Sequence, residues 1–410
     1  MVDPIGKNRT ILLLGNYRPA LTLARTLSAN GYKIIVGTQG CDHCCEHSHF
    51  VSQMWDHSDC TEHASLFLKE LDHFSKVQPA LAAIFPVSET YVRFFAENSR
   101  HLPGLPPVIM MDKLLVKKCL DKLFMMQLAK ERCIPMAEFT VARTADELDM
   151  ALDQLGLPVV IRPLGSVSRL NGEKAIIVRN KTELDFLDID WQQNREGLLL
   201  QKEFSGIRHN IYFAAYEGRI VRYLHAVITR TDRTDGTGLA VDGITVEPDV
   251  ELRRQTNSLV KALNCSGIGC AQYLVNESTR ETSFLEINPR IAGNHAVPEH
   301  AGLELGKFLL DLVLTGKPDL TPYTGPAGIR YSWMSGYLVT IKTSLGNGEI
   351  SIGEALRRWR SAITSALGAD VHMMFSWSDP LPGLNALWVA IPPLWRRWRG
   401  TKNRHPSSGV

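Results

Sequence analysis

The sequence predicts a multidomain protein of mixed α/β and α+β class, with an open parallel α/β domain at its N-terminus. Its 410 residues exceed the ~250–300 residues at which a single hydrophobic core stops growing, so the chain should divide into several units. Strand and helix patterns alternate near the N-terminus, as in parallel sheets, whereas strand mostly follows strand further along. A two-lobed unit should therefore follow the first domain, and a smaller C-terminal region completes the chain.

The N-terminal domain is predicted from a repeated strand and helix pattern. Residues 10–15 form a compact apolar run that ends in glycine, residues 20–30 are amphipathic, and residues 32–37 are apolar again. This spacing is typical of a βαβ unit with a parallel sheet. Residues 82–87 repeat the pattern with a helix behind them. We therefore expect residues 1–110 to form the open α/β domain.

Residues 111–205 are expected to contain linker helices and a small α+β lobe. Residues 112–132 predict one helix or two in series, which Pro135 stops. Thr144 and Glu147 resemble a capping box at the start of a further helix. The expected strands of this lobe are at 136–142, 158–162, 174–179 and 197–203.

Residues 206–320 are expected to form a larger lobe. Its predicted strands are at 210–216, 219–230, 267–276 and 282–288. Residues 321–400 give no clear pattern and remain of uncertain fold, while residues 401–410 are predicted to be a disordered tail.

Composition excludes some classes of partner. The net charge is +2, with 44% hydrophobic and 21% charged residues, which gives no overall case for nucleic acid. The N-terminus lacks the long apolar stretch of a secretory signal, and the chain has no run of 18 apolar residues. Its eight cysteines form no disulfide framework. We therefore expect a cytoplasmic protein.

The strongest chemical signal lies in two adjacent strand patterns, residues 269–276 and 283–290. If these strands pair in an antiparallel hairpin, Gln272, Glu286 and Asn288 present side-chain oxygens on one face. Hard oxygen ligands of this kind suit Mg²⁺ that bridges nucleotide phosphates. Arg290 follows a proline, and its guanidinium can bind a phosphoryl group or a substrate carboxylate.

The segment from Glu286 to Arg290, with its oxygen-bearing neighbour strand, resembles the metal-binding segment of the ATP-grasp superfamily. Gln272 makes it similar to the carbamoyl-phosphate synthetase and biotin carboxylase branch. The resemblance spans about residues 10–315 and implies a pre-ATP-grasp domain followed by a two-lobed ATP-grasp fold. It also implies that Lys122 and Arg162 bind the nucleotide phosphates, where two cations offset the charge that develops during transfer. Arg162 and Arg290 are then the expected catalytic residues.

The resemblance places adenine and ribose as well. Residues 198–204 look like the hinge strand that receives adenine, with Gln201 and Lys202 at the positions where relatives carry an acidic residue and a lysine. Arg208 and His209 are similar to the Arg-His pair of biotin carboxylases, which places His209 near the ribose. A strand histidine satisfied by its neighbours is the alternative for His209.

The function implied by the resemblance is an ATP-dependent ligase that joins a carboxylate to an amine. ATP and Mg²⁺, with Mn²⁺ as a substitute, serve as cofactors; an acyl phosphate forms, and ADP and phosphate are released. The expected partners are small-molecule carboxylate and amine substrates, and a homodimer is compatible with the family. Two alternatives stay open: an enzyme that uses bicarbonate in a carboxylase or carbamoyl-phosphate reaction, and a catalytically weak ATP-binding regulatory protein.

One departure from the family favours the regulatory alternative. The phosphate-covering loop of the family is usually rich in glycine, because backbone N–H groups approach phosphates only where side chains are absent. Here residues 164–173 contain only Gly165 and Gly172. Ser166, Ser168 and Arg169 are the alternative donors.

Three further segments each allow two interpretations. In the polar loop 230–238, Arg230 or Arg233 either clamps a substrate carboxylate or belongs to a solvated hairpin loop. The Cys/His-rich residues 41–49 crowd their ligands into one short stretch, which favours an irregular loop over a zinc site. Residues 387–400 combine tryptophans with arginines and either pack onto the domain or contact a membrane interface.

Overall fold

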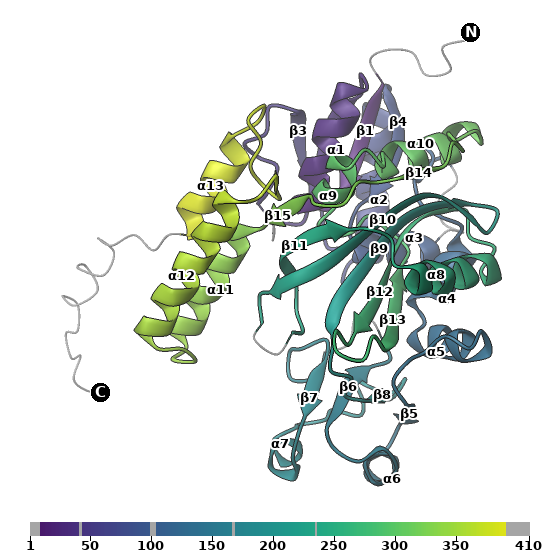
Figure 1. Ribbon diagram of the computed structural model, residues 1–410. Helices are drawn as coiled ribbons and strands as arrows, with labels where there is room; N and C mark the ends of the chain where they lie inside the picture. The colour runs from purple at the N-terminus through teal and green to yellow at the C-terminus, as the bar shows by residue number, and fades with distance from the viewer. Residues whose placement is uncertain (1–8, 41–42, 99–103, 166–168, 234–235, 391–410) are drawn as a thin grey trace, which may run out of the picture.

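The computed structural model describes residues 9–40, 43–98, 104–165, 169–233 and 236–390. Figure 1 shows the N-terminal α/β domain at the top, the strongly curved large sheet in the middle and the small lobe at the bottom. The C-terminal helices stand to one side of the large sheet. This mixed architecture confirms the predicted fold class; the division at residues 110, 205 and 320 stays a prediction.

The N-terminal domain is built on a parallel sheet with strand order β3-β2-β1-β4. All of its pairs are parallel, as the βαβ spacing predicts. β3 and α2 were not predicted, because polar residues interrupt their apolar patterns. The strands are β1 (Thr10–Leu14), β2 (Lys33–Thr38), β3 (Val51–Asp56) and β4 (Leu81–Pro86), and the helices are α1 (Arg18–Ala29), α2 (Ala64–Val77) and α3 (Glu89–Asn98).

Two helices in series lead to the small lobe, α4 (Lys113–Leu120) and α5 (Lys122–Glu131). Asp121 separates them, because its side chain caps α5 by accepting a hydrogen bond from the backbone N–H of Phe124 at 2.9 Å. At the start of α6 (Ala145–Leu155), Thr144 accepts from the N–H of Glu147 at 3.2 Å. The Glu147 carboxylate accepts in turn from the Arg143 N–H at 2.7 Å, so the predicted reciprocal cap forms one residue further out.

The small lobe is an antiparallel sheet with strand order β5-β8-β6-β7. The four predicted strands are present, each shorter than or displaced from its predicted range by a few residues. They are β5 (Phe139–Ala142), β6 (Val159–Pro163), β7 (Ile176–Val178) and β8 (Leu198–Lys202), with the short α7 (Lys181–Asp185) after β7.

The large lobe is a mainly antiparallel sheet with strand order β13-β12-β9-β10-β11-β15-β16, and β14 pairs with β10. Two of its helices, α9 (Ala296–His300) and α10 (Leu305–Thr315), lie toward the N-terminal domain. The other elements are β9 (Ile207–Tyr216), β10 (Arg219–Thr231), β11 (Ala240–Val246), α8 (Val250–Ala262), β12 (Gly267–Val275) and β13 (Thr282–Asn288).

The C-terminal region, of uncertain fold from the sequence, extends this sheet and adds helices. β14 (Tyr323–Thr324), β15 (Arg330–Ser332) and β16 (Val371–His372) join the large sheet, and α11 (Met334–Gly346), α12 (Ile352–Leu367) and α13 (Leu381–Ala390) pack on one another. Residues 391–410, including Trp395, Trp398 and the predicted tail, lie outside the described residues. Within the described part of the chain, no helix has the length and apolar character needed to cross a membrane.

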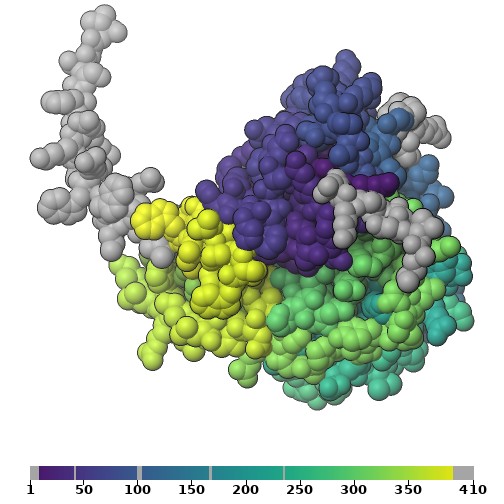
Figure 2. All heavy atoms as spheres, turned by 90° about the horizontal axis from the view of Figure 1, so that it is seen from above, coloured from purple at the N-terminus to yellow at the C-terminus, as the bar shows by residue number. Residues whose placement is uncertain are grey.

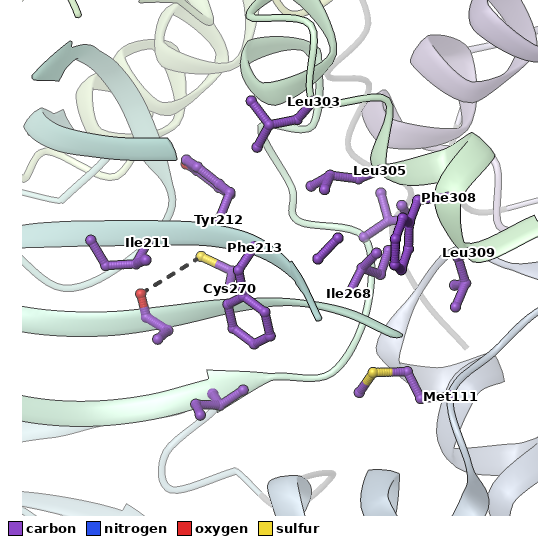
Figure 3. Close-up of a cluster of buried hydrophobic side chains, with 14 of the residues drawn as sticks. Met111, Ile211, Tyr212, Phe213, Ile268, Cys270, Leu303, Leu305, Phe308 and Leu309 are labelled. Atoms are coloured by element: carbon purple, nitrogen blue, oxygen red, sulfur yellow. Dashed lines mark hydrogen bonds between the residues drawn. The ribbon is translucent and has the colours of Figure 1, made fainter. Parts of the chain in front are cut away.

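A continuous hydrophobic core joins the N-terminal domain to the large lobe. Figure 3 shows Leu305, Phe308 and Leu309 of α10 facing Phe213 of β9 and Ile268 of β12. Seen from above, the N-terminal domain covers the large lobe, and the C-terminal region lies against both (Figure 2). Because the units are packed together, side chains from distant parts of the chain can meet in one cleft.

Candidate active site

A cleft of about 450 Å³ lies where the N-terminal domain, the linker helices and the two lobes meet. Its lining brings together most of the residues that the sequence singled out. From the predicted site it contains Lys122, Arg162, Gln272, Glu286, Asn288 and Arg290. The placement of these side chains in one cleft agrees with the predicted site, while their roles stay proposals.

The predicted hairpin of β12 and β13 forms one wall of the cleft. The strands pair antiparallel, with Gln272 opposite Glu286 and Cys270 opposite Asn288. Glu286 and Asn288 are two residues apart on one strand, so both face the cleft. The hairpin and its shared polar face are therefore confirmed.

Glu286 is held as a carboxylate. Its Oε2 accepts a hydrogen bond from Arg162 Nη2 at 2.9 Å, and its Oε1 accepts from the Asn288 amide at 2.8 Å. Burial alone would raise its pKa, but Arg162, Asn288 and Arg290 outweigh burial and lower the pKa to about 2. A negative charge is therefore fixed on this wall at neutral pH.

Lys122 and Arg162 lie near each other in the cleft, in the part that we name the phosphate end after their predicted role. Lys122 is the first residue of α5, and its ammonium donates to the carbonyl oxygens of Pro163 and, at 3.3 Å, Leu164. Those residues end β6 and begin the loop 164–173. Burial, and next the charge of Arg162, lower the pKa of Lys122 to about 8. Lys122 therefore loses its proton more easily than an ordinary lysine, and an anion beside it would oppose that loss.

Arg290 is tied to the N-terminal domain. Its Nη2 lies 3.3 Å from Glu89 Oε2, and Glu89 opens α3. Burial alone would lower the pKa of Arg290, but Tyr17 and Glu89 raise it, so the guanidinium stays charged. Arg290 therefore links the hairpin of β12 and β13 to the first domain.

The donor set fits a hard divalent cation. Among the described residues, no group of three or more His, Cys, Asp or Glu side chains could hold a metal. Glu286 instead supplies one ionised carboxylate, and Gln272 and Asn288 supply amide oxygens beside it. Mg²⁺ is commonly bound by one or two carboxylates together with substrate phosphates. The site is therefore suited to a cation that enters with a nucleotide.

The side chains of Gln201, Lys202 and His209 are not among those that line this cleft, and their predicted nucleotide contacts stay predictions. Gln201 is buried in β8 and donates to the Met126 sulfur at 3.6 Å. The Lys202 ammonium donates to carbonyl oxygens at the end of α6 and in the following turn, the nearest being Leu155 O at 2.9 Å. Both are occupied by structural contacts.

His209 points to the other face of the large sheet. Its neighbours Arg208 and Asn210 line the cleft, and successive strand residues alternate between faces. His209 Nδ1 lies 2.8 Å from Nε2 of His225. Burial, and then His225, lower the pKa of His209 to about 4. His209 thus has a partner on a neighbouring strand, as the alternative describes, and its ribose contact stays a prediction.

The two polar loops meet beside the cleft. Ser166 and Ser168 lie outside the described residues, whereas Glu173, at the end of the same loop, forms an ion pair with Arg233. Arg230 is paired with Asp242 at 3.2 Å and donates to Ser361 of α12 at 2.8 Å, so part of its guanidinium is already bound within the protein.

The other two ambiguous segments are settled in part. In the Cys/His stretch, Ser48 and His49 bind Asp379 of the C-terminal region, while Cys41 and Asp42 lie outside the described residues. The described part is therefore an irregular docking loop. Trp388 of the tryptophan and arginine segment is 76% exposed, so it does not pack onto the domain.

Other lining residues were missed by the sequence argument. They come from separate elements, and no local spacing connects them to the hairpin motif. They include Arg18 at the start of α1, Glu89 at the start of α3, and Lys174, Asn210 and Asn294. The position of Arg18 and Glu89 after the carboxyl ends of parallel strands was the one available signal.

Comparison with known proteins supports this architecture. Residues 242–314 match the family model of the carbamoyl-phosphate synthase L chain ATP-binding domain. Biotin carboxylase from Campylobacter jejuni has a similar structure, with a TM-score of 0.60 and 16% identity over 76% of this chain and 72% of that chain. N5-carboxyaminoimidazole synthetase from Staphylococcus aureus, in complex with ADP, has a TM-score of 0.59 and 13% identity over 78% of this chain and 80% of that chain. An L-amino acid ligase from Bacillus licheniformis has a TM-score of 0.55 and 14% identity over 76% of this chain and 75% of that chain.

The chain has the fold of these structures, and its matched segment agrees with the ATP-grasp resemblance of the sequence. Within that superfamily, the matched segment is similar to the ATP-binding domain of carbamoyl-phosphate synthase and contains the whole hairpin of β12 and β13.

Proposed function

We propose that this protein is an ATP- and Mg²⁺-dependent ligase that phosphorylates a carboxylate and couples it to an amine, releasing ADP and phosphate. The observation that carries the proposal is the cleft itself. One ionised carboxylate, Glu286, lies between the cations of the phosphate end and Arg290. A nucleotide-phosphate site with a metal needs this alternation of charge.

Each side chain has a role in this proposal. Lys122 and Arg162 hold the nucleotide phosphates through charge-assisted hydrogen bonds. Glu286, with the amide oxygens of Gln272 and Asn288, would hold Mg²⁺, which neutralises charge on the phosphates when bound. Lys122 is pre-positioned, because its ammonium is fixed on the carbonyls that begin the phosphate loop.

The reaction then follows from the charges. A substrate carboxylate oxygen attacks the γ-phosphorus in line with the departing ADP, which forms an acyl phosphate. The amine attacks the acyl carbon, phosphate leaves with the bonding electron pair, and the amine nitrogen releases a proton to solvent. Arg290 offsets the negative charge on the acyl and phosphate oxygens, and its link to Glu89 fixes its position.

The test follows the oxygen atom. With a substrate carboxylate labelled with heavy oxygen, one labelled atom should appear in the released phosphate, and the nucleotide product should be ADP. Glu286→Gln keeps the shape but removes the metal-binding charge, and it should abolish transfer. Glu277→Gln is the matched control, because Glu277 is exposed between the same two strands. Labelled oxygen in AMP would refute the acyl phosphate route.

Nucleotide binding is tested separately. Lys122→Ala should weaken MgADP binding by at least about tenfold, because a hydrogen bond to a charged group is worth about 1.5–3 kcal/mol. Lys130→Ala, an exposed lysine on the same helix, should leave it unchanged. Equal affinities in the two variants would contradict the phosphate assignment.

The same assays separate the two alternatives. Labelled bicarbonate as the only carboxylate that transfers oxygen to phosphate would favour the carboxylase type. Tight MgATP binding without ADP release over a panel of acids and amines would favour the regulatory type, in line with the glycine-poor loop.

A further inference from the structure

The cleft has a second pair of cationic side chains besides Lys122 and Arg162. This pair is Arg18 and Arg208, which line the cleft with Asn210, Asn294 and the loop residues before β11. The charges of both arginines act on the buried Tyr331, where they oppose the rise in pKa that burial causes. We name this part of the cleft the Arg18 pocket. None of its side chains takes part in the transfer chemistry described above.

Arg18 is buried without a matching anion. It is 7% exposed, its guanidinium carbon lies 3.4 Å above the centre of the Trp333 ring, and burial lowers its pKa to about 10. Among the described residues, its Nη1 has no hydrogen-bond partner. Asp232 acts on it through charge, but the Asp232 side chain accepts from the Leu239 N–H at 2.7 Å. The Arg18 guanidinium therefore has a buried N–H donor, on Nη1, without a hydrogen-bond partner in the described part of the chain.

Arg208 repeats this pattern from the opposite wall. Its Nη1 donates to the carbonyl of Gly238 at 3.0 Å, which fixes the guanidinium plane. Its Nε and Nη2 are buried, and neither has a partner in the described part of the chain. The two free nitrogens belong to one planar fork, which matches the two oxygens of a carboxylate.

The backbone leaves room for a ligand at this point. A Cβ at Gly293 would lie 3.4 Å from Arg18 Nη2, which is an ordinary van der Waals contact, so the backbone borders this guanidinium without crowding it. Asn294, the next residue, uses its amide N–H groups on Tyr212 and Tyr331. The wall is thus fixed by buried hydrogen bonds.

The cost of this arrangement indicates a ligand. A buried donor without a partner costs about 1–3 kcal/mol, and native proteins leave few of them. At the phosphate end, by contrast, Lys122 and Arg162 already bind carbonyl and carboxylate oxygens. Among the described residues that line the cleft, the unpaired donors therefore lie mainly in the Arg18 pocket.

We propose that the Arg18 pocket binds a non-reacting carboxylate of a substrate, so that one of the two substrates is a dicarboxylic acid or an amino acid. The inference rests on the proposed ligase function for the identity of its ligand. Arg18 and Arg208 act as specificity-determining residues that hold this second carboxylate while chemistry takes place near Arg290.

The direct test uses malonate and its neutral isostere malonamide as probes, titrated calorimetrically into protein saturated with MgADP. The nucleotide occupies the phosphate end, so the probes report the Arg18 pocket. Malonate should bind and malonamide should not. Arg18→Met and Arg208→Met should each weaken malonate binding by at least about tenfold, while Lys130→Met, at an exposed position of α5, should leave it unchanged. Unfolding temperatures without ligand show that each variant is folded.

Several outcomes would overturn the proposal. These are no malonate binding to the wild type, equal affinity in Arg18→Met, equal binding of malonamide, or inorganic phosphate binding more tightly than malonate. Because this assay needs no turnover, its failure is separate from failure of the ligase reaction. Phosphate release then shows which of the two substrates carries the second carboxylate. Turnover with dicarboxylates plus a simple amine shows that the acid substrate carries it. Turnover with amino acids plus a monocarboxylate shows that the amine substrate carries it. Arg18→Met should raise KM for that substrate alone.

Discussion

The ion pair between Arg162 and Glu286 joins the small lobe to the large lobe, and Arg162→Met removes it. The pair and the neighbouring donors lower the pKa of Glu286 from its ordinary 4.5 to about 2. At about 1.4 kcal/mol per pKa unit, this shift corresponds to about 3 kcal/mol of stabilisation at neutral pH. We therefore expect Arg162→Met to lower the free energy of unfolding by up to about 3 kcal/mol.

The loss should depend on pH in a defined direction. Because the folded pKa of Glu286 is depressed, its contribution is present above pH 4.5 and is lost as the pH falls toward about 2. Without Arg162, only Asn288 and Arg290 still oppose the effect of burial, so the pKa of Glu286 should be higher in the variant than in the wild type and Glu286 should be protonated at a higher pH. The difference between wild type and variant should therefore be smaller at ~pH 3.5 than at ~pH 7.

The assay is urea unfolding at both pH values, followed by fluorescence and far-UV circular dichroism to check for a single transition. Glu286→Gln and the double variant complete a double-mutant cycle. In the Glu286→Gln background, Arg162→Met should have a small effect that is independent of pH. A loss of equal size in both backgrounds, or at both pH values, would refute the electrostatic argument.

Three further predictions follow from the same electrostatics. MgADP affinity should fall as the pH rises above about 8, where Lys122 loses its proton, and calorimetry of Lys122→Met should show no such fall. Burial lowers the pKa of His209 from its ordinary 6.5 to about 4. The free energy of unfolding should therefore fall by up to about 3 kcal/mol as the pH decreases from 6.5 to 4, as measured by urea unfolding. His209→Gln should reduce this pH-dependent loss. Asp379→Asn breaks a buried contact with Arg25 at 3.0 Å and should lower the unfolding free energy by about 3 kcal/mol. An unchanged urea midpoint would contradict that assignment.

The sequence alone determined the hairpin that carries the proposed metal ligands. Side chains on a strand alternate between two faces, so the two-residue spacing of Glu286 and Asn288 is sufficient to put them on one face. The cap at Thr144 and the break at Asp121 are equally local, since each depends on hydrogen bonds within about four residues. Local periodicity and capping are properties of a short segment and can therefore be predicted from it.

Only the tertiary structure decided which distant residues complete the cleft. Arg18, Glu89 and Asn294 come from separate elements, and no spacing along the chain relates them to Glu286. The direction of His209 likewise depends on the register of β9 against β12, which pairs Asn210 with Gln272 and sends His209 to the other face. Contacts between such distant residues depend on how the sheets and helices pack against one another. That packing is determined by the whole core and not by any local sequence pattern.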